Sequence, residues 1–137
     1  MVEVFLVHPG GPFFAKRDDG AWSIPKGEIE PGGEPLATAQ REFREETGFA
    51  LRFDRFDPLG SVRQAGGKVV HAWAAEGDCD ASAICSNTFE LRGRSYPEVD
   101  RAGWFALDEA RRKILGGQRP LLDALETLLA APARAGG

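Results

Sequence analysis

Apolar runs separated by glycine- and proline-rich turns mark the start of the chain. Residues 2–7 are β-branched and almost continuously apolar, which predicts a short strand buried on both faces. The proline- and glycine-rich stretch at residues 9–12 ends this strand. After a turn signal at residues 18–20, residues 22–24 predict a second short extended segment.

Residues 35–47 predict the clearest helix of the chain. Pro35 suits the first helical position, and Gly48 suits the position just past the last turn. Leu36 and Phe43 fall on one stripe of this helix, which is therefore expected to pack against the core.

The rest of the chain predicts further strands and helices. Two strands joined by a turn, one last strand and two closing helices are expected at residues 59–64, 68–75, 103–106, 107–115 and 120–129. Residues 77–94 predict a loop-rich segment, and residues 130–137 predict a frayed tail. We therefore expect one α/β domain over residues 1–129.

Composition narrows the classes of function. The 137 residues, of which 42% are hydrophobic and 28% charged, are typical of one globular domain. The net charge of −4 provides no general field for phosphates, so we expect no extended nucleic acid as a partner. No apolar run reaches the length of a membrane span, and the N-terminus does not have the layout of a signal peptide. We therefore expect a cytoplasmic protein without membrane contact, whose two cysteines are reduced thiols.

Three carboxylates gather on one side of the predicted helix. Because each residue turns by about 100°, Glu42, Glu45 and Glu46 lie within roughly 100° of one another. Like charges this close cost about a few tenths of a kcal/mol per pair, and a cation with oxygen ligands such as Mg²⁺ would reverse that cost. The alternative is a solvated acidic face whose charge is relieved by Arg41 and Arg44.

A longer motif surrounds these carboxylates. From Gly27 the chain reads Gly-Glu-Ile-Glu-Pro-Gly-Gly-Glu, and from Arg41 it reads Arg-Glu-Phe-Arg-Glu-Glu-Thr-Gly-Phe. This resembles the Nudix box, which is Gly, five residues, Glu, seven residues, then Arg-Glu-apolar-any-Glu-Glu-any-Gly-apolar. The resemblance covers 23 positions and implies a Nudix-type α/β/α sandwich with a mixed central sheet.

The sequence departs from the family pattern at two points. The first glutamate of the box falls at Gly33, and Glu34 follows one place later. Glu34 is expected to replace it after a small loop shift, and weakened activity is the alternative. Nudix domains also carry a strand before the one expected at residues 2–7, so either the natural start lies upstream or the sheet leaves an edge exposed.

The resemblance implies a pyrophosphohydrolase that cuts a nucleoside diphosphate linked to another group, with Mg²⁺ or Mn²⁺ as cofactor. By motif position, Glu45 and Glu46 would bind the metal, and Glu42 would be a further ligand or the base that activates water. The backbone carbonyl of Lys26 would be another metal contact. The positions that support the motif would be Gly27, Glu34, Arg41 and Gly48.

A fourth catalytic carboxylate is expected from a later loop, as is common in this family. Glu98, shortly before the last predicted strand, is our candidate. The alternatives are Glu76, Glu90, or a Glu98 that is only a surface residue.

The lead-in to the box bears on the substrate. Its sequence Trp-Ser-Ile-Pro-Lys-Gly resembles that of Nudix enzymes that cut diadenosine polyphosphates or diphosphoinositol polyphosphates. Lys26 would contact a long phosphate chain, and Arg63 would line the same cleft. Trp22 would stack on a base or, alternatively, pack in the core.

We therefore expect a small-molecule nucleotide or another phosphoanhydride as substrate, and within this class a dinucleoside polyphosphate or a nucleoside triphosphate. The protein would act as a monomer or a homodimer. The alternative is a Nudix-fold module that binds a nucleotide with weak or no hydrolysis.

Overall fold

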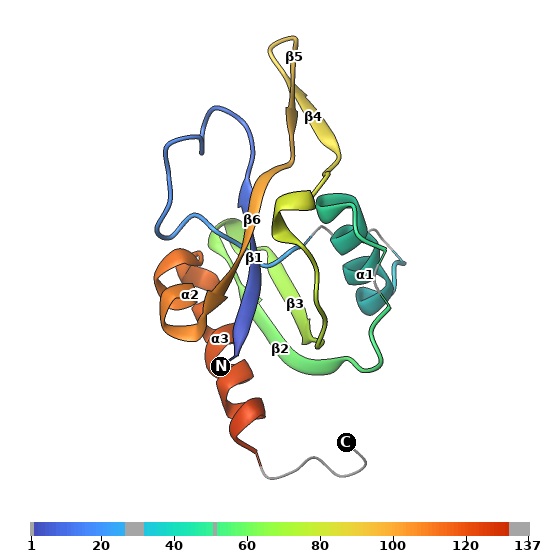
Figure 1. The fold of residues 1–137 in the computed structure, drawn as a ribbon, viewed down its shortest axis with the longest axis vertical. Coiled ribbons are helices and arrows are strands. Elements are labelled where there is room, and N and C mark those ends of the chain that lie inside the picture. The colour runs from blue at the N-terminus through green and yellow to red at the C-terminus, as the bar shows by residue number, and fades with distance from the viewer. Residues whose placement is uncertain (1, 27–31, 51, 132–137) are drawn as a thin grey trace.

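A computed structural model of the chain describes residues 2–26, 32–50 and 52–131 (Figure 1). Its elements are, in order, β1 (Glu3–Pro9), α1 (Pro35–Thr47), β2 (Asp57–Arg63), η1 (Ala65–Gly67), β3 (Val69–Ala74), η2 (Ala81–Ala83), β4 (Thr88–Leu91), β5 (Arg94–Pro97), β6 (Val99–Ala106), α2 (Leu107–Lys113), η3 (Gly116–Gln118) and α3 (Arg119–Ala130). The helix predicted at residues 35–47 is confirmed with both bounds. None of the described helices is long and apolar enough to cross a membrane.

The segment predicted to be loop-rich, residues 77–94, is partly wrong. It contains β4, which pairs with β5 in an antiparallel hairpin that projects from the body of the molecule (Figure 1). The last strand is also longer than predicted, because β6 already begins at Val99. In the segment predicted to be extended at residues 22–24, Trp22 and Ser23 form isolated bridges instead of a strand, with Ser23 beside Val7 and Trp22 beside Ile114.

The described strands form three antiparallel pairs, β1–β6, β2–β3 and β4–β5. The expected single mixed sheet is therefore not continuous in the described part of the chain, because β1 and β3 each pair with a strand on one side only. The expectation that the sheet lacks the usual strand before β1 stays a prediction. Residues 132–137 of the predicted tail lie outside the described residues.

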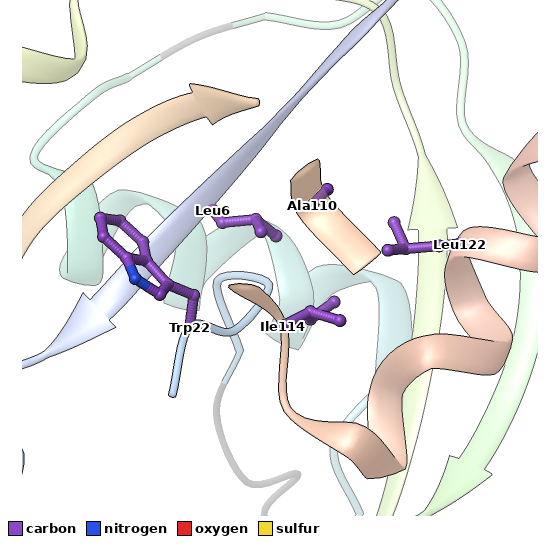
Figure 2. Close-up of a cluster of buried hydrophobic side chains, with 5 residues drawn as sticks. All are labelled: Leu6, Trp22, Ala110, Ile114 and Leu122. Atoms are coloured by element: carbon purple, nitrogen blue, oxygen red, sulfur yellow. The ribbon is translucent and has the colours of Figure 1, made fainter. Parts of the chain in front are cut away.

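Helices pack on both faces of the β1–β6 pair, which confirms the mixed α/β character (Figure 1). Phe5 of β1 points toward α1, where its ring lies 6.2 Å from that of Phe43. The neighbouring Leu6 points the other way and is fully buried with Trp22 and residues of α2 and α3 (Figure 2). As predicted, adjacent residues of this strand are thus covered on opposite faces.

Candidate functional site

The helix that carries the carboxylates begins at a cap made by Glu34. The carboxylate of Glu34 accepts hydrogen bonds from the backbone N–H groups of Leu36 (3.1 Å) and Ala37 (2.6 Å). These donors have no partner inside the helix, so the cap stabilises its first turn. This role of Glu34 was not predicted from the sequence, although a carboxylate directly before Pro35 at the helix start is a signal for it.

Replacing Glu34 by Ala is expected to lower the free energy of unfolding by about 0.5–2 kcal/mol, because the cap is lost. Glu34→Ser keeps a capping oxygen and should recover most of this stability. Urea unfolding measures both variants, and hydrolysis assays accompany it. Wild-type activity in Glu34→Ser would show that Glu34 acts only as a helix cap. A loss of activity of more than about tenfold in that stable variant would support its role as the displaced box glutamate.

The other end of the helix is fixed by Thr47 and Gly48. The fully buried Thr47 donates its hydroxyl to the carbonyl of Phe43 (2.6 Å) and accepts the N–H of Phe49 (3.1 Å). Gly48 has a φ of +79°, and a Cβ built there would lie 2.6 Å from the carbonyl oxygen of Cys85. Both the backbone conformation and the space at this position therefore require glycine.

Arg41 holds two of the three helix carboxylates. Its guanidinium lies 3.5 Å from the carboxylate of Glu42 and 3.8 Å from that of Glu45. Arg41 therefore relieves part of the charge of both carboxylates, as expected for it in the alternative of a solvated face. Glu42 is the better buried of the two, with 15% of its side chain exposed against 38% for Glu45.

Glu46 faces the loop that precedes the box. Its carboxylate accepts a hydrogen bond from the backbone N–H of Lys26 (3.2 Å). Burial raises the pKa of Glu46 to about 7; the N–H and the charge of Lys26 oppose this rise, and the nearby charges of Glu42 and Glu98 add to it. Burial, and then the charge of Glu45, also raise the pKa of Glu42. Glu46 is therefore not the solvated side chain that a simple acidic face would contain.

A chain of backbone hydrogen bonds connects Glu98 to the helix. The N–H of Asn87 donates to the carbonyl of Glu45 (2.9 Å), and the N–H of Glu98 donates to the carbonyl of Asn87 (2.8 Å). On the other side, the N–H of Gly10 donates to the carbonyl of Glu98 (2.9 Å). The charge of Glu98 acts on both Glu42 and Glu46, so the structure brings this candidate to the helix carboxylates.

The rival candidates lie elsewhere. Glu76 lines an apolar groove on another side of α1, and Glu90 stands in β4 opposite Ser95. Asn87, which joins Glu98 to Glu45 through its main chain, was not found by sequence reasoning. Its contribution is made by backbone atoms, so its residue type gives no signal.

Gly10 offers a test of how Glu98 is held. A Cβ at Gly10 would collide with the carbonyl oxygen of Pro97, the residue before Glu98, so Gly10→Ala should displace this bend. We expect hydrolysis to fall by about tenfold, or about 1.4 kcal/mol in the barrier. Gly116→Ala is the matched control, because neither glycine has a positive φ and a Cβ at Gly116 meets no atom within 4 Å. Equal kinetics for the two variants would contradict the positioning of Glu98 by this contact.

The donor atoms fit a divalent cation in their chemistry. No group of three or more His, Cys, Asp or Glu side chains in the described ranges is already gathered closely enough to hold a metal ion. Glu42, Glu45 and Glu46 nevertheless offer the carboxylate oxygens that Mg²⁺ prefers, and their mutual repulsion is the cost that a cation removes. Gly27, a predicted motif position, lies outside the described residues.

Of the two remaining substrate-binding candidates, Trp22 lies in the core and Arg63 lies at the surface. Trp22 is 5% exposed, and its indole N–H donates to the carboxylate of Asp18 (2.8 Å). Packing in the core, one of the two alternatives for this residue, therefore accounts for its position. Arg63 is exposed at the end of β2 and donates to the carbonyl of Gly67 (3.2 Å) across the turn to β3.

Comparisons with known proteins give one family and two similar solved structures. Residues 3–125 match the model of the NUDIX domain. An Ap4A hydrolase of C. elegans is similar in structure, with a TM-score of 0.61, 21% identity, and coverage of 93% of this chain and 87% of that one. A MutT protein from Methanosarcina mazei Go1 has a TM-score of 0.63 and 18% identity, and the match covers 94% of this chain and 86% of that one. Among curated proteins, no match to this sequence was found.

Proposed function

This chain belongs to the NUDIX family of pyrophosphohydrolases, and we propose that it hydrolyses a phosphoanhydride bond in a nucleoside diphosphate linked to another group, with Mg²⁺ or Mn²⁺ as cofactor. The observation that carries the proposal is the setting of Glu46. Its carboxylate is bound to the N–H of Lys26, and the charges of Glu42 and Glu98 act on it. Several like charges held together in this way are favourable once a cation joins them.

Within this proposal, Glu45 and Glu46 hold the cation, together with Glu42 and the carbonyl of Lys26. When bound, a divalent cation neutralises charge on the phosphate oxygens and lowers the pKa of an attacking water. Arg41 orients Glu42 and Glu45, since its guanidinium contacts both.

The base that removes the proton from the water is proposed to be Glu98, with Glu42 as the second candidate. Glu98 is exposed, and its N–H and carbonyl are both tied by hydrogen bonds, so its side chain starts from a fixed position. Glu42 contacts Arg41, which competes for its carboxylate. A base must come within hydrogen-bond reach of the water, and a fixed backbone favours this for Glu98.

The proposed substrate is a dinucleoside polyphosphate, with nucleoside triphosphates as the second choice. Lys26 lies at the carboxylates, because its charge acts on Glu46, and it is therefore well placed to contact phosphates. The similarity to the Ap4A hydrolase supports the same class. We expect the enzyme to work in the cytoplasm on small molecules, as a monomer or a homodimer.

A panel of nucleotides tests this proposal. A dinucleoside tetraphosphate, a nucleoside triphosphate and an ADP-sugar are incubated with Mg²⁺, with Mn²⁺ and with EDTA, and the phosphate products are separated by chromatography. We expect cleavage that requires the cation and returns when EDTA is titrated with Mg²⁺. Tight binding without cleavage would favour a module that only binds nucleotides. This module is the second candidate because Gly33 stands where the box has its first glutamate.

A further inference from the structure

A fully buried histidine that the proposed hydrolysis does not use lies near the end of β1. His8 has no exposed surface, and its ring packs edge-on against the ring of Trp22 at 5.2 Å. Its Nδ1 lies 2.8 Å from a carboxylate oxygen of Asp100 in β6, and its Nε2 lies 2.6 Å from the carbonyl oxygen of Arg17. The side chain therefore connects β1 to β6 and to the loop that follows β1.

Both ring nitrogens of His8 face acceptors. A carbonyl oxygen only accepts hydrogen bonds, so Nε2 must carry a hydrogen. An ionised carboxylate also only accepts, so a second hydrogen must lie between Nδ1 and Asp100. An imidazolium meets both requirements, and its buried charge then has a partner in the carboxylate of Asp100.

The other charged groups around this pair do not take its place. The guanidinium of Arg101 lies 3.9 Å from the carboxylate of Asp100, which is long for an ion pair. In the loop after β1, the carboxylate of Asp18 is bound to the ammonium of Lys113 at 2.7 Å. In the described part of the chain, the shortest charged contact of Asp100 is therefore the one to His8.

The bond between His8 and Asp100 lies at a bulge in β6. The register of the two strands places His8 opposite Arg101. It then places Pro9 opposite Val99, so Asp100 has no partner in β1. Pro9 has no N–H to donate within this interval. The side chain of His8 thus supplies a bond that holds the bulged residue in place.

Glu98, the proposed base, lies just beyond this bulge. A bulge bends its strand and changes the direction of the residues beside it, and only two positions separate Asp100 from Glu98. The N–H of Gly10 donates to the carbonyl of Glu98 at 2.9 Å, which orients the peptide after the bend. That bond does not act on Asp100, so the bend itself depends on His8.

We propose that His8 is a positioning residue for Glu98: as an imidazolium it fixes the bulge at Asp100, and the bulge directs the main chain at Glu98. This inference rests on the proposed function, because Glu98 affects the rate only as the base. His8 is fully buried, so it cannot contact a substrate and acts on hydrolysis only through the main chain.

Two substitutions of His8 each keep one of its contacts. The amide nitrogen of His8→Asn stands near Nδ1 and can donate to Asp100, whereas that of His8→Gln reaches as far as Nε2 and can donate to Arg17. Both variants lose the ring. We expect kcat of His8→Gln to be about tenfold below that of His8→Asn, with a similar KM, because a displaced base slows the chemical step. Equal values, or a lower kcat in His8→Asn, would overturn the proposal.

Variants of Asp100 test the same bond without opening the core, since 33% of this side chain is exposed. Asp100→Asn keeps an amide that can bond to Nδ1, and Asp100→Ala does not. We expect kcat to fall about tenfold in Asp100→Ala and less than about threefold in Asp100→Asn. Asp123→Ala is the matched control, because it removes a charged bond of similar length (2.9 Å, to Arg111) and should leave kcat unchanged. Equal kcat in Asp100→Ala and Asp123→Ala would overturn the proposal.

NMR spectroscopy tests the proposal without turnover and so separates it from the proposed hydrolysis. The chain has two histidines, His8 and His71, and His71→Asn assigns their ring signals. At pH 7 we expect a hydrogen on both ring nitrogens of His8 in ¹⁵N spectra. We also expect the backbone amide signal of Glu98 to move from its wild-type position further in His8→Gln than in His8→Asn.

The two kinds of failure can be distinguished. A single ring N–H on His8 in the wild type, or an amide signal of Glu98 that is the same in both His8 variants, would overturn the positioning role. A chain that gives the expected spectra but cleaves no nucleotide with Mg²⁺ or Mn²⁺ would contradict the proposed hydrolysis and leave the bond between His8 and Asp100 as the support of the bulge.

Discussion

Glu46→Gln is expected to lower kcat/KM by roughly a thousandfold or more, equal to about 4 kcal/mol in the barrier. In the proposed function this carboxylate holds the cation, and the amide keeps its shape but not its charge. The hydrogen bond from the N–H of Lys26 can remain, since the amide oxygen also accepts. Steady-state kinetics over a range of Mg²⁺ concentrations measure the loss, and near-normal turnover would remove Glu46 from the metal ligands.

The same substitution should stabilise the cation-free protein above neutral pH. The pKa of Glu46 is raised from its ordinary 4.5 to about 7, so the folded chain binds this proton more tightly than the unfolded chain does. The resulting stability is present below pH 4.5 and is lost as the pH rises through 7. At pH 8 the variant should therefore be more stable by on the order of 1–3 kcal/mol, and near pH 5 the gain should be small.

Urea unfolding in EDTA at pH 5 and pH 8 measures this difference. Glu45→Gln is the control, because the charge of Glu45 is partly offset by Arg41 at 3.8 Å and its removal brings no comparable gain. A gain for Glu46→Gln that is the same at both pH values would contradict the raised pKa as its cause.

Lys26→Ala is expected to remove most of the preference for long phosphate chains. A contact between the ammonium and an extra phosphate contributes roughly 1.5–3 kcal/mol, or about ten- to a hundredfold in kcat/KM. Because the charge of Lys26 also lowers the pKa of Glu46, all substrates should lose some activity. The informative quantity is the ratio of kcat/KM for a dinucleoside tetraphosphate to that for a nucleoside triphosphate.

Lys26→Arg keeps the charge and should keep most of this ratio. An unchanged ratio in Lys26→Ala would show that the preference comes from other residues. A wild-type ratio at or below one would contradict the proposed substrate class but not the proposed hydrolysis.

Local signals determined how well the sequence predicted the fold. The bounds of α1 could be predicted because Pro35, the apolar stripe and Gly48 all lie within the helix or beside it. The β4–β5 hairpin could not, since its strands have only four residues each and turn at Arg92, which has a φ of +52°. Such short, largely exposed strands have little hydrophobic alternation to detect.

Contacts between distant segments determine the positions of those site residues that could not be predicted from the sequence. Trp22 suits a base-stacking platform as well as a core, and the choice depends on neighbours such as Leu6 and Ile114. The position of Glu98 depends in the same way on main-chain bonds to Gly10 and Asn87. Backbone partners of this kind are independent of residue type and become visible only in the folded chain.

The bond between Asn87 and Glu98 also closes the base of the β4–β5 hairpin. The hydroxyl of Ser86 reinforces this closure, because it accepts the N–H of Val99 and lies within bonding distance of that residue's carbonyl (both 3.1 Å). The hairpin is therefore fixed at both ends of its base, and the ring of Phe89 in β4 also lies beside Gly11. We therefore expect changes of length and side chain near Arg92 and Gly93, at the far end of this hairpin, to leave the backbone position of Glu98 unchanged.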